Sequence, residues 1–371
     1  MACDPYLAPV PAILGLHPYQ PGKPIEELAR ELGLDHRAIV KLASNENPLG
    51  PSPKAIMAVK AVLGGDLARY PDGSGFVLKQ KLAAKLGVKM EQITLGNGSN
   101  DVLDLVARAF LGPGRSAVFS QYAFAVYPIA TQAVGATARL APAWNYGHDL
   151  AAMLERVGDD TAVVFIANPN NPTGTWVKRE ELLEFLHALP QQVVVVVDEA
   201  YCEYIEFADY PNALEWLEAF PNLIVTRTFS KAYGLAGFRV GYAVSSSQVA
   251  EFLNRVRQPF NVNSLALVAA TAALDDEEHL AASRELNRQG LLQLTEAFEV
   301  RGLKYIPGVG NFITVDVGRE AGPVFSALLE HGVIVRPLAN YDLPNHLRVS
   351  VGTEKDNARF IAALDRVLSD A

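Results

Sequence analysis

The sequence predicts an α/β protein built on one large, mainly parallel β-sheet, and three observations lead to this prediction. Seven short apolar runs recur between residues 92 and 244, separated by segments of helical periodicity. Several runs are rich in valine and isoleucine without alternating polar residues, which is typical of strands buried on both faces. Polar, glycine-rich segments follow several of the runs directly. The runs cover residues 92–95, 117–120, 136–140, 162–167, 193–197, 223–228 and 239–244.

The segments outside these runs predict a smaller α+β domain and an N-terminal arm. Residues 1–44 are rich in proline, which favours an irregular path with one helix at 24–32. The remaining expected elements are helices at 53–63 and 75–86, a long helical stretch over 247–300, strands at 311–317, 333–335 and 346–351, and a closing helix at 354–368. We therefore expect an arm at 1–45 that belongs to the small domain, a large domain at 46–255 and a small domain at 256–371.

Composition narrows the classes of partner. The 371 residues include 32 Lys and Arg against 41 Asp and Glu, a formal net charge of −9. A net acidic chain repels phosphate backbones and anionic lipid, so we expect no nucleic-acid or membrane partner. Two cysteines, Cys3 and Cys202, and seven scattered histidines predict neither a disulfide framework nor a metal site. No signal-peptide pattern is present, which predicts a cytoplasmic protein.

Two strand ends carry segments that could bind an anion or an oxygen. Residues 96–101, Gly-Asn-Gly-Ser-Asn-Asp, precede a helix and could cradle a phosphate, or form a tight turn in which Asn100 or Asp101 caps that helix. The third glycine of a dinucleotide fingerprint is absent. Residues 168–174, Asn-Pro-Asn-Asn-Pro-Thr-Gly, read as a turn, although an amide there could donate to a ligand oxygen.

An acidic residue and a lysine follow two other runs. Asp198 comes directly after five valines, so its carboxylate is expected to be buried and to need a partner. That partner is either a structural cation or a protonated ligand nitrogen, and Tyr201 could contact the same ligand. Lys231 lies in a glycine-rich bend with Thr228, Ser230 and Arg239 nearby in sequence.

The position of Lys231 favours a desolvated amine with a lowered pKa. An exposed lysine is the ordinary alternative, but a buried strand end favours a desolvated amine, and desolvation together with Arg239 lowers its pKa. Such an amine is a good nucleophile for forming a Schiff base. An amine, an acid, a phenol, an amide and a phosphate cup are together the parts that a pyridoxal 5′-phosphate (PLP) enzyme requires.

These segments carry a resemblance to a known family. The chain resembles the fold-type I, aspartate-aminotransferase-like PLP enzymes in the segment 230–242, the Asn-Pro-Thr-Gly turn and the Asp-Glu-Ala-Tyr strand end. Within that family it is similar to the histidinol-phosphate aminotransferases. That similarity rests on the segments Tyr-Gln-Pro-Gly-Lys-Pro at 19–24, Lys-Leu-Ala-Ser-Asn-Glu-Asn-Pro at 41–48 and Arg-Tyr-Pro-Asp-Gly at 69–73. It extends over nearly the whole chain.

The resemblance implies a role for each cofactor residue. Lys231 would hold PLP and carry a proton between the substrate Cα and the cofactor C4′, while Asp198 would keep the pyridine nitrogen protonated. Tyr201 and Asn171 would bond the cofactor's 3′ oxygen. The residues implied for its phosphate are Ser99, Asn100, Thr228, Ser230, Arg239 and, from a neighbouring subunit, Tyr70. The ring-stacking aromatic would be Phe124, three residues before Tyr127; because the local motif lacks the usual proline, Tyr122 is the alternative.

The resemblance also implies the substrates and the assembly. Arg348, with Arg336 and Tyr19, would bind the substrate's anionic group, and Tyr70 implies a homodimer with shared sites. The leading hypothesis is transamination between L-histidinol phosphate and 2-oxoglutarate in histidine biosynthesis. Its alternatives on the same scaffold are an aromatic amino-acid aminotransferase and a phosphothreonine-type decarboxylase. Outside this class, a nucleotide-dependent oxidoreductase and a non-catalytic PLP-binding protein remain, and Lys231 counts against both.

Overall fold

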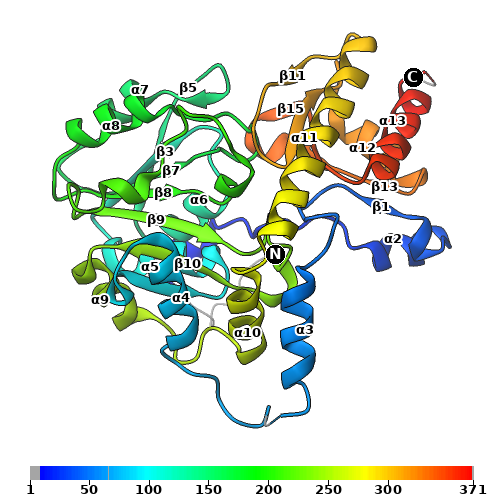
Figure 1. The fold of residues 1–371 in the computed structure, drawn as a ribbon. Helices are drawn as coiled ribbons and strands as arrows, with labels where there is room; N and C mark the ends of the chain where they lie inside the picture. The colour runs from blue at the N-terminus through cyan, green and yellow to red at the C-terminus, as the bar shows by residue number, and fades with distance from the viewer. Residues whose placement is uncertain (1–8, 66, 370–371) are drawn as a thin grey trace.

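A seven-stranded sheet forms the centre of the larger part of the molecule (Figure 1). The computed structural model describes residues 9–65 and 67–369, so Cys3 and the proline-rich start of the arm lie outside the described residues. The strand order is β2-β10-β9-β8-β7-β3-β4, and all strands are parallel except β10, which is antiparallel to both neighbours. The bounds are β2 Ile93–Gly96, β3 Ser116–Ser120, β4 Thr137–Ala141, β7 Thr161–Ala167, β8 Val194–Asp198, β9 Leu223–Thr228 and β10 Gly241–Ser245.

All seven predicted strands are confirmed, with ends displaced by one or two residues. The central strands are buried on both faces because helices cover the sheet on each side. In β7, Val163 and Phe165 face one hydrophobic core while Val164 and Ile166 face the other. This arrangement explains why the runs lack polar alternation.

Two layers of helices enclose the sheet (Figure 1). One layer contains α5 (Ser99–Phe110), α6 (Val126–Ala133) and α9 (Ser247–Val256). The other contains α3 (Pro53–Val62), α4 (Phe76–Leu86), α7 (Leu150–Glu155), α8 (Arg179–Ala188) and α10 (Ser264–Ala273). Local sequence sets their ends: the Ser52 hydroxyl accepts a hydrogen bond from the backbone N–H of Ala55 at the start of α3, and Gly87 ends α4 at a φ of 69°.

The smaller part of the molecule is an antiparallel sheet of order β11-β12-β15-β14 packed against helices (Figure 1). Its strands are β11 Tyr305–Ile306, β12 Phe312–Asp316, β14 Arg336–Leu338 and β15 Leu343–Ser350. Its helices are α11 (Glu277–Val300), α12 (Ala321–Glu330) and α13 (Glu354–Ser369). The arm contributes α1 (Pro11–Leu14), α2 (Ile25–Leu32) and β1 (Val40–Lys41), which pairs in parallel with β13 (Val333–Ile334).

Short elements complete the chain. A hairpin joins β5 (Ala143–Trp144) to β6 (Gly147–His148). The 3-10 helices are η1 His36–Ala38, η2 Met90–Gln92, η3 Cys202–Tyr204, η4 Ala213–Trp216, η5 Ala236–Phe238 and η6 Ala339–Tyr341. Within residues 9–65 and 67–369, no helix combines the length and apolarity needed to cross a membrane.

The helical stretch predicted over 247–300 is divided into three helices. The side chain of Asn263 accepts a hydrogen bond from Ala266 N and starts α10, and that of Asp276 accepts from His279 N and starts α11. The division into 1–45, 46–255 and 256–371 stays a prediction. Because α10 packs against α3 and contributes to the core of the larger part, we propose that α10 belongs with the large domain.

Gly234, in the bend after Lys231, offers a test of backbone packing. It has a φ of 68°, and a Cβ there would overlap the carbonyl oxygen of Gly50. Gly87 has a similar φ of 69° but open space around it. We expect Gly234→Ala to lower the free energy of unfolding by about 1–3 kcal/mol more than Gly87→Ala, measured by urea denaturation. Equal losses in the two variants would contradict the close approach.

Candidate active site

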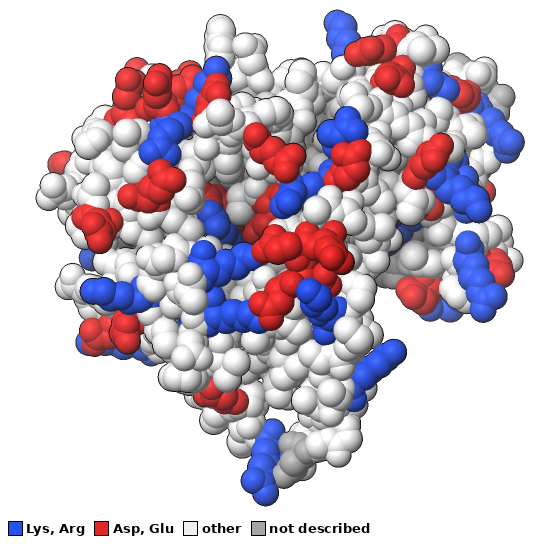
Figure 2. All heavy atoms as spheres, in the orientation of Figure 1, with Lys and Arg blue, Asp and Glu red and all other residues white. Residues whose placement is uncertain are grey.

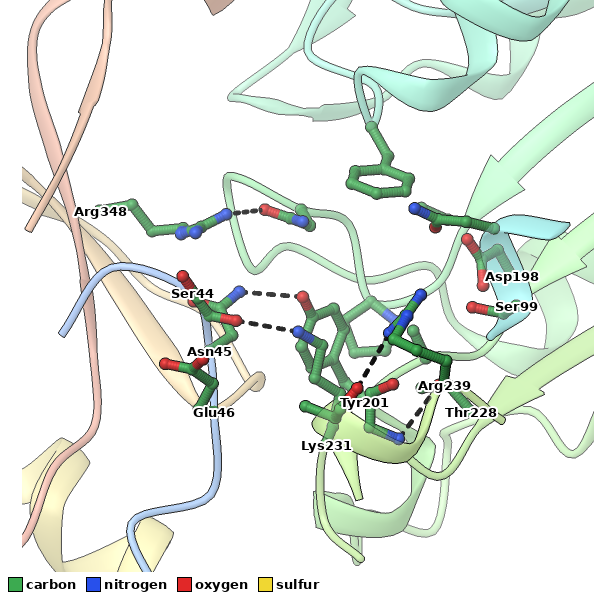
Figure 3. Close-up of a pocket in the computed structure, with 18 of the residues that line it drawn as sticks. Ser44, Asn45, Glu46, Ser99, Asp198, Tyr201, Thr228, Lys231, Arg239 and Arg348 are labelled. Carbon is green, nitrogen blue, oxygen red and sulfur yellow. Dashed lines mark hydrogen bonds between the residues drawn. The ribbon is translucent and has the colours of Figure 1, made fainter. Parts of the chain in front are cut away.

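A cavity of about 370 Å³ lies where the carboxyl ends of β7, β8 and β9 meet residues from the smaller part (Figure 3). This volume is within the range of small-molecule sites. Ser44, Asn45, Glu46 and Arg348 enter from the side opposite Asp198 and Ser99, as Figure 3 shows. Twelve predicted site residues line it: Tyr19, Ser99, Asn100, Phe124, Asn171, Asp198, Tyr201, Thr228, Ser230, Lys231, Arg239 and Arg348.

Lys231 is the amine of the site. It follows β9, its Nζ donates a hydrogen bond of 3.0 Å to the carbonyl oxygen of Ser44, and it lies 5.7 Å from the centre of the Tyr201 ring. Burial lowers the pKa of Lys231 from 10.5 to about 7, and the positive charges of Arg348 and Arg239 add to this effect. A large fraction of this amine is therefore neutral, and nucleophilic, near neutral pH.

Asp198 is the last residue of β8 and is 4% exposed. Strand pairing sets it between Ala167 of β7 and Thr226 of β9. Its carboxylate accepts hydrogen bonds from Thr226 Oγ1 at 2.8 Å and from the Tyr127 hydroxyl at 3.0 Å. Burial raises the pKa of Asp198 from 3.8 to about 6, because these two hydrogen bonds only partly compensate for lost hydration. A cationic ligand nitrogen would stabilise its charged form.

Polar groups of Tyr201 and Asn171 face the same space. Burial raises the pKa of Tyr201, so its hydroxyl stays protonated at neutral pH. Asn171 Oδ1 accepts a hydrogen bond of 2.5 Å from Arg348 Nη1, which leaves the Asn171 amide nitrogen as a donor. Phenol and amide are thus both able to donate to an oxygen in the cavity.

One end of the cavity is built for an anion. Helix α5 begins at Ser99, so the backbone N–H groups of Ser99 and Asn100 have no partners within the helix. Arg239, at a φ of 59°, brings its guanidinium against Gly98, where a Cβ would overlap it. It donates to the carbonyl oxygens of Ala236 and Asn97, and no carboxylate among the described residues pairs with it. This cup has the donors that a phosphate needs.

The remaining predicted residues have different surroundings. Arg336 does not line this cavity; its guanidinium lies 5.8 Å from the Tyr19 ring and it borders a neighbouring cavity. Phe124 lines the cavity, whereas Tyr122 packs beside Leu338 and Tyr341.

Tyr70 lies away from the cavity and is 81% exposed. Among the described residues, no three His, Cys, Asp or Glu side chains gather as a metal site.

Two features were missed by sequence reasoning. Segment 43–46 crosses the cavity, and the Ala43 carbonyl oxygen accepts from Arg348 Nη2 at 2.5 Å just as that of Ser44 accepts from Lys231. Backbone carbonyls leave no side-chain signature, so the sequence could not indicate this. The second feature is Tyr127, whose hydroxyl donates to Asp198; the sequence does not indicate this role, since a tyrosine inside a helix is usually a core residue.

Comparisons with known proteins identify the family. The family model for aminotransferases of class I and II matches residues 37–364. The chain therefore belongs to the class I and II aminotransferase family.

Relatives of high identity share one name. Histidinol-phosphate aminotransferase 2 from Methylococcus capsulatus is 64% identical over 365 residues, which cover 97% of this chain and 98% of the relative. Histidinol-phosphate aminotransferase 2 from Pseudomonas fluorescens Pf-5 is 62% identical over 361 residues, covering 97% of each chain. Within the family, the chain thus groups with the histidinol-phosphate aminotransferases.

Solved structures agree on the fold. Histidinol-phosphate aminotransferase from Sinorhizobium meliloti, solved in complex with pyridoxal-5′-phosphate, superposes with a TM-score of 0.89 at 29% identity, covering 100% of this chain and 99% of the other. An aspartate aminotransferase double mutant from Thermus thermophilus, at 22% identity, has a TM-score of 0.83 and covers 97% and 100%. The predicted aspartate-aminotransferase-like, fold-type I architecture is confirmed.

The lowered pKa of Lys231 can be measured by chemical labelling. In protein freed of bound small molecules, the acetylation rate of Lys231 should rise with pH through a midpoint of about 7. Arg348→Met should raise that midpoint by on the order of 1 unit, because it removes a nearby positive charge, whereas Arg348→Lys keeps the charge. Mass spectrometry of the labelled peptide gives the rate. A midpoint near 10, or equal shifts in both variants, would contradict the electrostatic account.

Proposed function

We propose that this chain transfers the amino group of L-histidinol phosphate to 2-oxoglutarate with PLP as cofactor, giving imidazole-acetol phosphate and glutamate in histidine biosynthesis, in the cytoplasm. The observation that carries the proposal is the enclosure of one neutralisable amine, Lys231, in a cavity that also contains a buried acid, Asp198, and a guanidinium without a carboxylate partner, Arg239. The names of the relatives support the choice of substrate.

The cavity residues fit PLP group by group. The phosphate would lie at the start of α5 against Arg239, Thr228 and Ser230, and the ring nitrogen would face Asp198. The buried carboxylate has a raised pKa, which indicates that it lacks a cation that a protonated pyridine nitrogen would supply. Phe124 would stack on the ring. Lys231 would hold PLP covalently through its amine, and the bound cofactor would supply an electron sink for the substrate Cα.

The chain's own residues then carry out the proton chemistry. Lys231, whose pKa is lowered to about 7, would accept the proton from the substrate Cα and return it at the cofactor C4′. The Asp198 carboxylate keeps the ring nitrogen protonated, and the hydrogen bonds from Thr226 and Tyr127 hold it in place. The Tyr201 hydroxyl and the Asn171 amide nitrogen bind the 3′ oxygen.

Buried arginines support an anionic substrate. Arg348 is 6% exposed and Arg336 is 8% exposed, and no carboxylate among the described residues forms an ion pair with either. Arg348 Nε also has no hydrogen-bond partner. A buried cation without a counter-charge is costly, so an arriving phosphate or carboxylate gains a strong interaction. We assign the substrate's phosphate to Arg348, with Arg336 and Tyr19 beside it.

The substrate can be tested by half-reactions. We expect single-turnover kcat/KM to be higher for histidinol phosphate than for phenylalanine or tyrosine by roughly 10²-fold, because only the first brings a phosphate to the arginines. Lys231→Ala should lower turnover at least about 10³-fold and abolish the borohydride-trapped PLP adduct seen by mass spectrometry. Lys304→Ala, at an exposed position of the smaller part of the molecule, is the control and should keep both. A colourless wild-type protein that cannot be reconstituted with PLP would refute the proposal.

A homodimer with shared sites is part of the proposal. Large apolar side chains are exposed along one stretch of chain and beside it: Met57, Leu63, Leu67, Tyr70, Phe76, Val77 and Phe260. The Tyr70 ring stacks on Phe260 at 4.6 Å, which keeps it outside its own cavity. Concentrated apolar exposure is typical of an interface, and it supports Tyr70 reaching the neighbour's cofactor phosphate.

Mixed dimers test the sharing. Tyr70→Ala chains and Lys231→Ala chains should each be impaired alone. Co-refolded in equal amounts, they should recover about a quarter of wild-type activity, because half of the dimers then hold one site free of both lesions. Activity of the mixture equal to the mean of the separate variants would mean that Tyr70 acts within its own chain.

A further inference from the structure

Asn45 joins three distant parts of the chain beside the cavity. It is 1% exposed and has a φ of 55°, a left-handed conformation that asparagine tolerates better than most residues. Its backbone N–H donates to Ser350 Oγ at 2.8 Å, and its carbonyl oxygen accepts from Asn311 Nδ2 at 3.0 Å. Its side chain contacts Tyr201 and Ser350. Every polar group of Asn45 therefore has a buried partner.

The direction of the Asn45 amide follows from its contact with Ser350. The Ser350 hydroxyl accepts a hydrogen bond from the backbone N–H of Asn45 and donates one to Asn45 Oδ1 at 2.8 Å. With the oxygen side of the amide facing Ser350, the nitrogen side faces Tyr201. Nδ2 donates to the Tyr201 hydroxyl oxygen at 2.9 Å. The phenol oxygen is an acceptor in this contact.

This contact leaves the proton of Tyr201 free for a ligand. Burial raises the pKa of Tyr201, so the hydroxyl keeps its proton. Since the hydroxyl accepts from Asn45, its proton must point elsewhere, and no acceptor among the described residues takes it. Tyr201 lines the cavity, so the proton is available to an oxygen there. The charged groups that act on the pKa of the hydroxyl, Arg348 and Asp198, themselves line the cavity.

We propose that Asn45 is a positioning residue that turns the Tyr201 hydroxyl proton into the cavity, toward the 3′ oxygen of PLP. The inference rests on the proposed function, since it assigns a direction to a hydrogen bond within that site. The same turn of chain holds the Lys231 amine through the Ser44 carbonyl, so residues 44 and 45 set the direction of both groups that act near the cofactor's reactive carbon.

Asn45→Gly is the variant that separates the side chain from the backbone. Glycine adopts the left-handed conformation without strain, so the path of the chain is kept while the amide is lost. A donor to the 3′ oxygen stabilises its anionic form. It therefore lowers the pKa at which the visible absorbance of the bound cofactor changes, called here the absorbance pKa. We expect Asn45→Gly to raise that pKa by about 0.5 unit and to weaken PLP binding by about 3-fold, measured by equilibrium dialysis.

Two further variants distinguish donation from packing. Asn45→Asp keeps an acceptor for Ser350 but cannot donate to Tyr201, so it should raise the absorbance pKa at least as much as Asn45→Gly. Asn47 is a buried neighbour whose amide donates to Ala232 O and Ser283 Oγ instead. Asn47→Ala should lower the melting temperature of the protein and leave the absorbance pKa unchanged. A wild-type pKa in Asn45→Asp would overturn the proposal.

A double variant tests whether Asn45 acts through the Tyr201 hydroxyl. Tyr201→Phe should raise the absorbance pKa by about 1 unit, and adding Asn45→Gly to it should cause no further rise, because Asn45 acts only through the hydroxyl. Full additivity of the two shifts would show that Asn45 acts by another route. A wild-type protein without any PLP absorbance would instead refute the proposed function.

Discussion

The desolvation of the Lys231 amine is the constraint on which the rest of the site depends. An amine with the pKa of a free lysine would be almost fully charged at neutral pH and could not act as a nucleophile. Burial at the end of β9 and two neighbouring guanidiniums bring this pKa to about 7. The Ser44 carbonyl then directs the amine without adding a negative charge that would reverse the effect. A carboxylate in that position would raise the pKa again.

The same low-polarity environment acts on Asp198 in the opposite direction. Its pKa rises to about 6, still low enough for a carboxylate to predominate at neutral pH. Burial therefore favours the neutral form of both titratable groups, Lys231 and Asp198. The hydrogen bonds from Thr226 and Tyr127 lower the pKa of Asp198 and so favour its carboxylate form. The pairing of β7, β8 and β9 makes this possible, because it brings three buried strand ends to one edge.

Segment 43–46 explains how the smaller part of the molecule contributes to this edge. Its carbonyl oxygens hold Arg348 and Lys231, and Asn45 connects Ser350 of β15 to Tyr201. The residues that would bind the substrate's anion and those that would bind the cofactor thus share one short piece of backbone. Basic and acidic side chains are interspersed over the outer face in Figure 2. Within the cavity, by contrast, Arg239 and Arg348 have no carboxylate partner among the described residues.

The amino-acid sequence by itself determined the seven strands, the order of the polar strand ends and the choice of Lys231, Asp198 and Arg239 as candidates, all of which line the cavity. These follow from local patterns, since buried strands lack alternation and functional groups follow them directly. Tertiary structure alone decided that Phe124 and not Tyr122 lines the cavity, and that Ser44 and Asn45 hold the reactive groups. Those outcomes depend on contacts across as many as 305 residues of sequence, and on backbone carbonyls that are identical in every residue type.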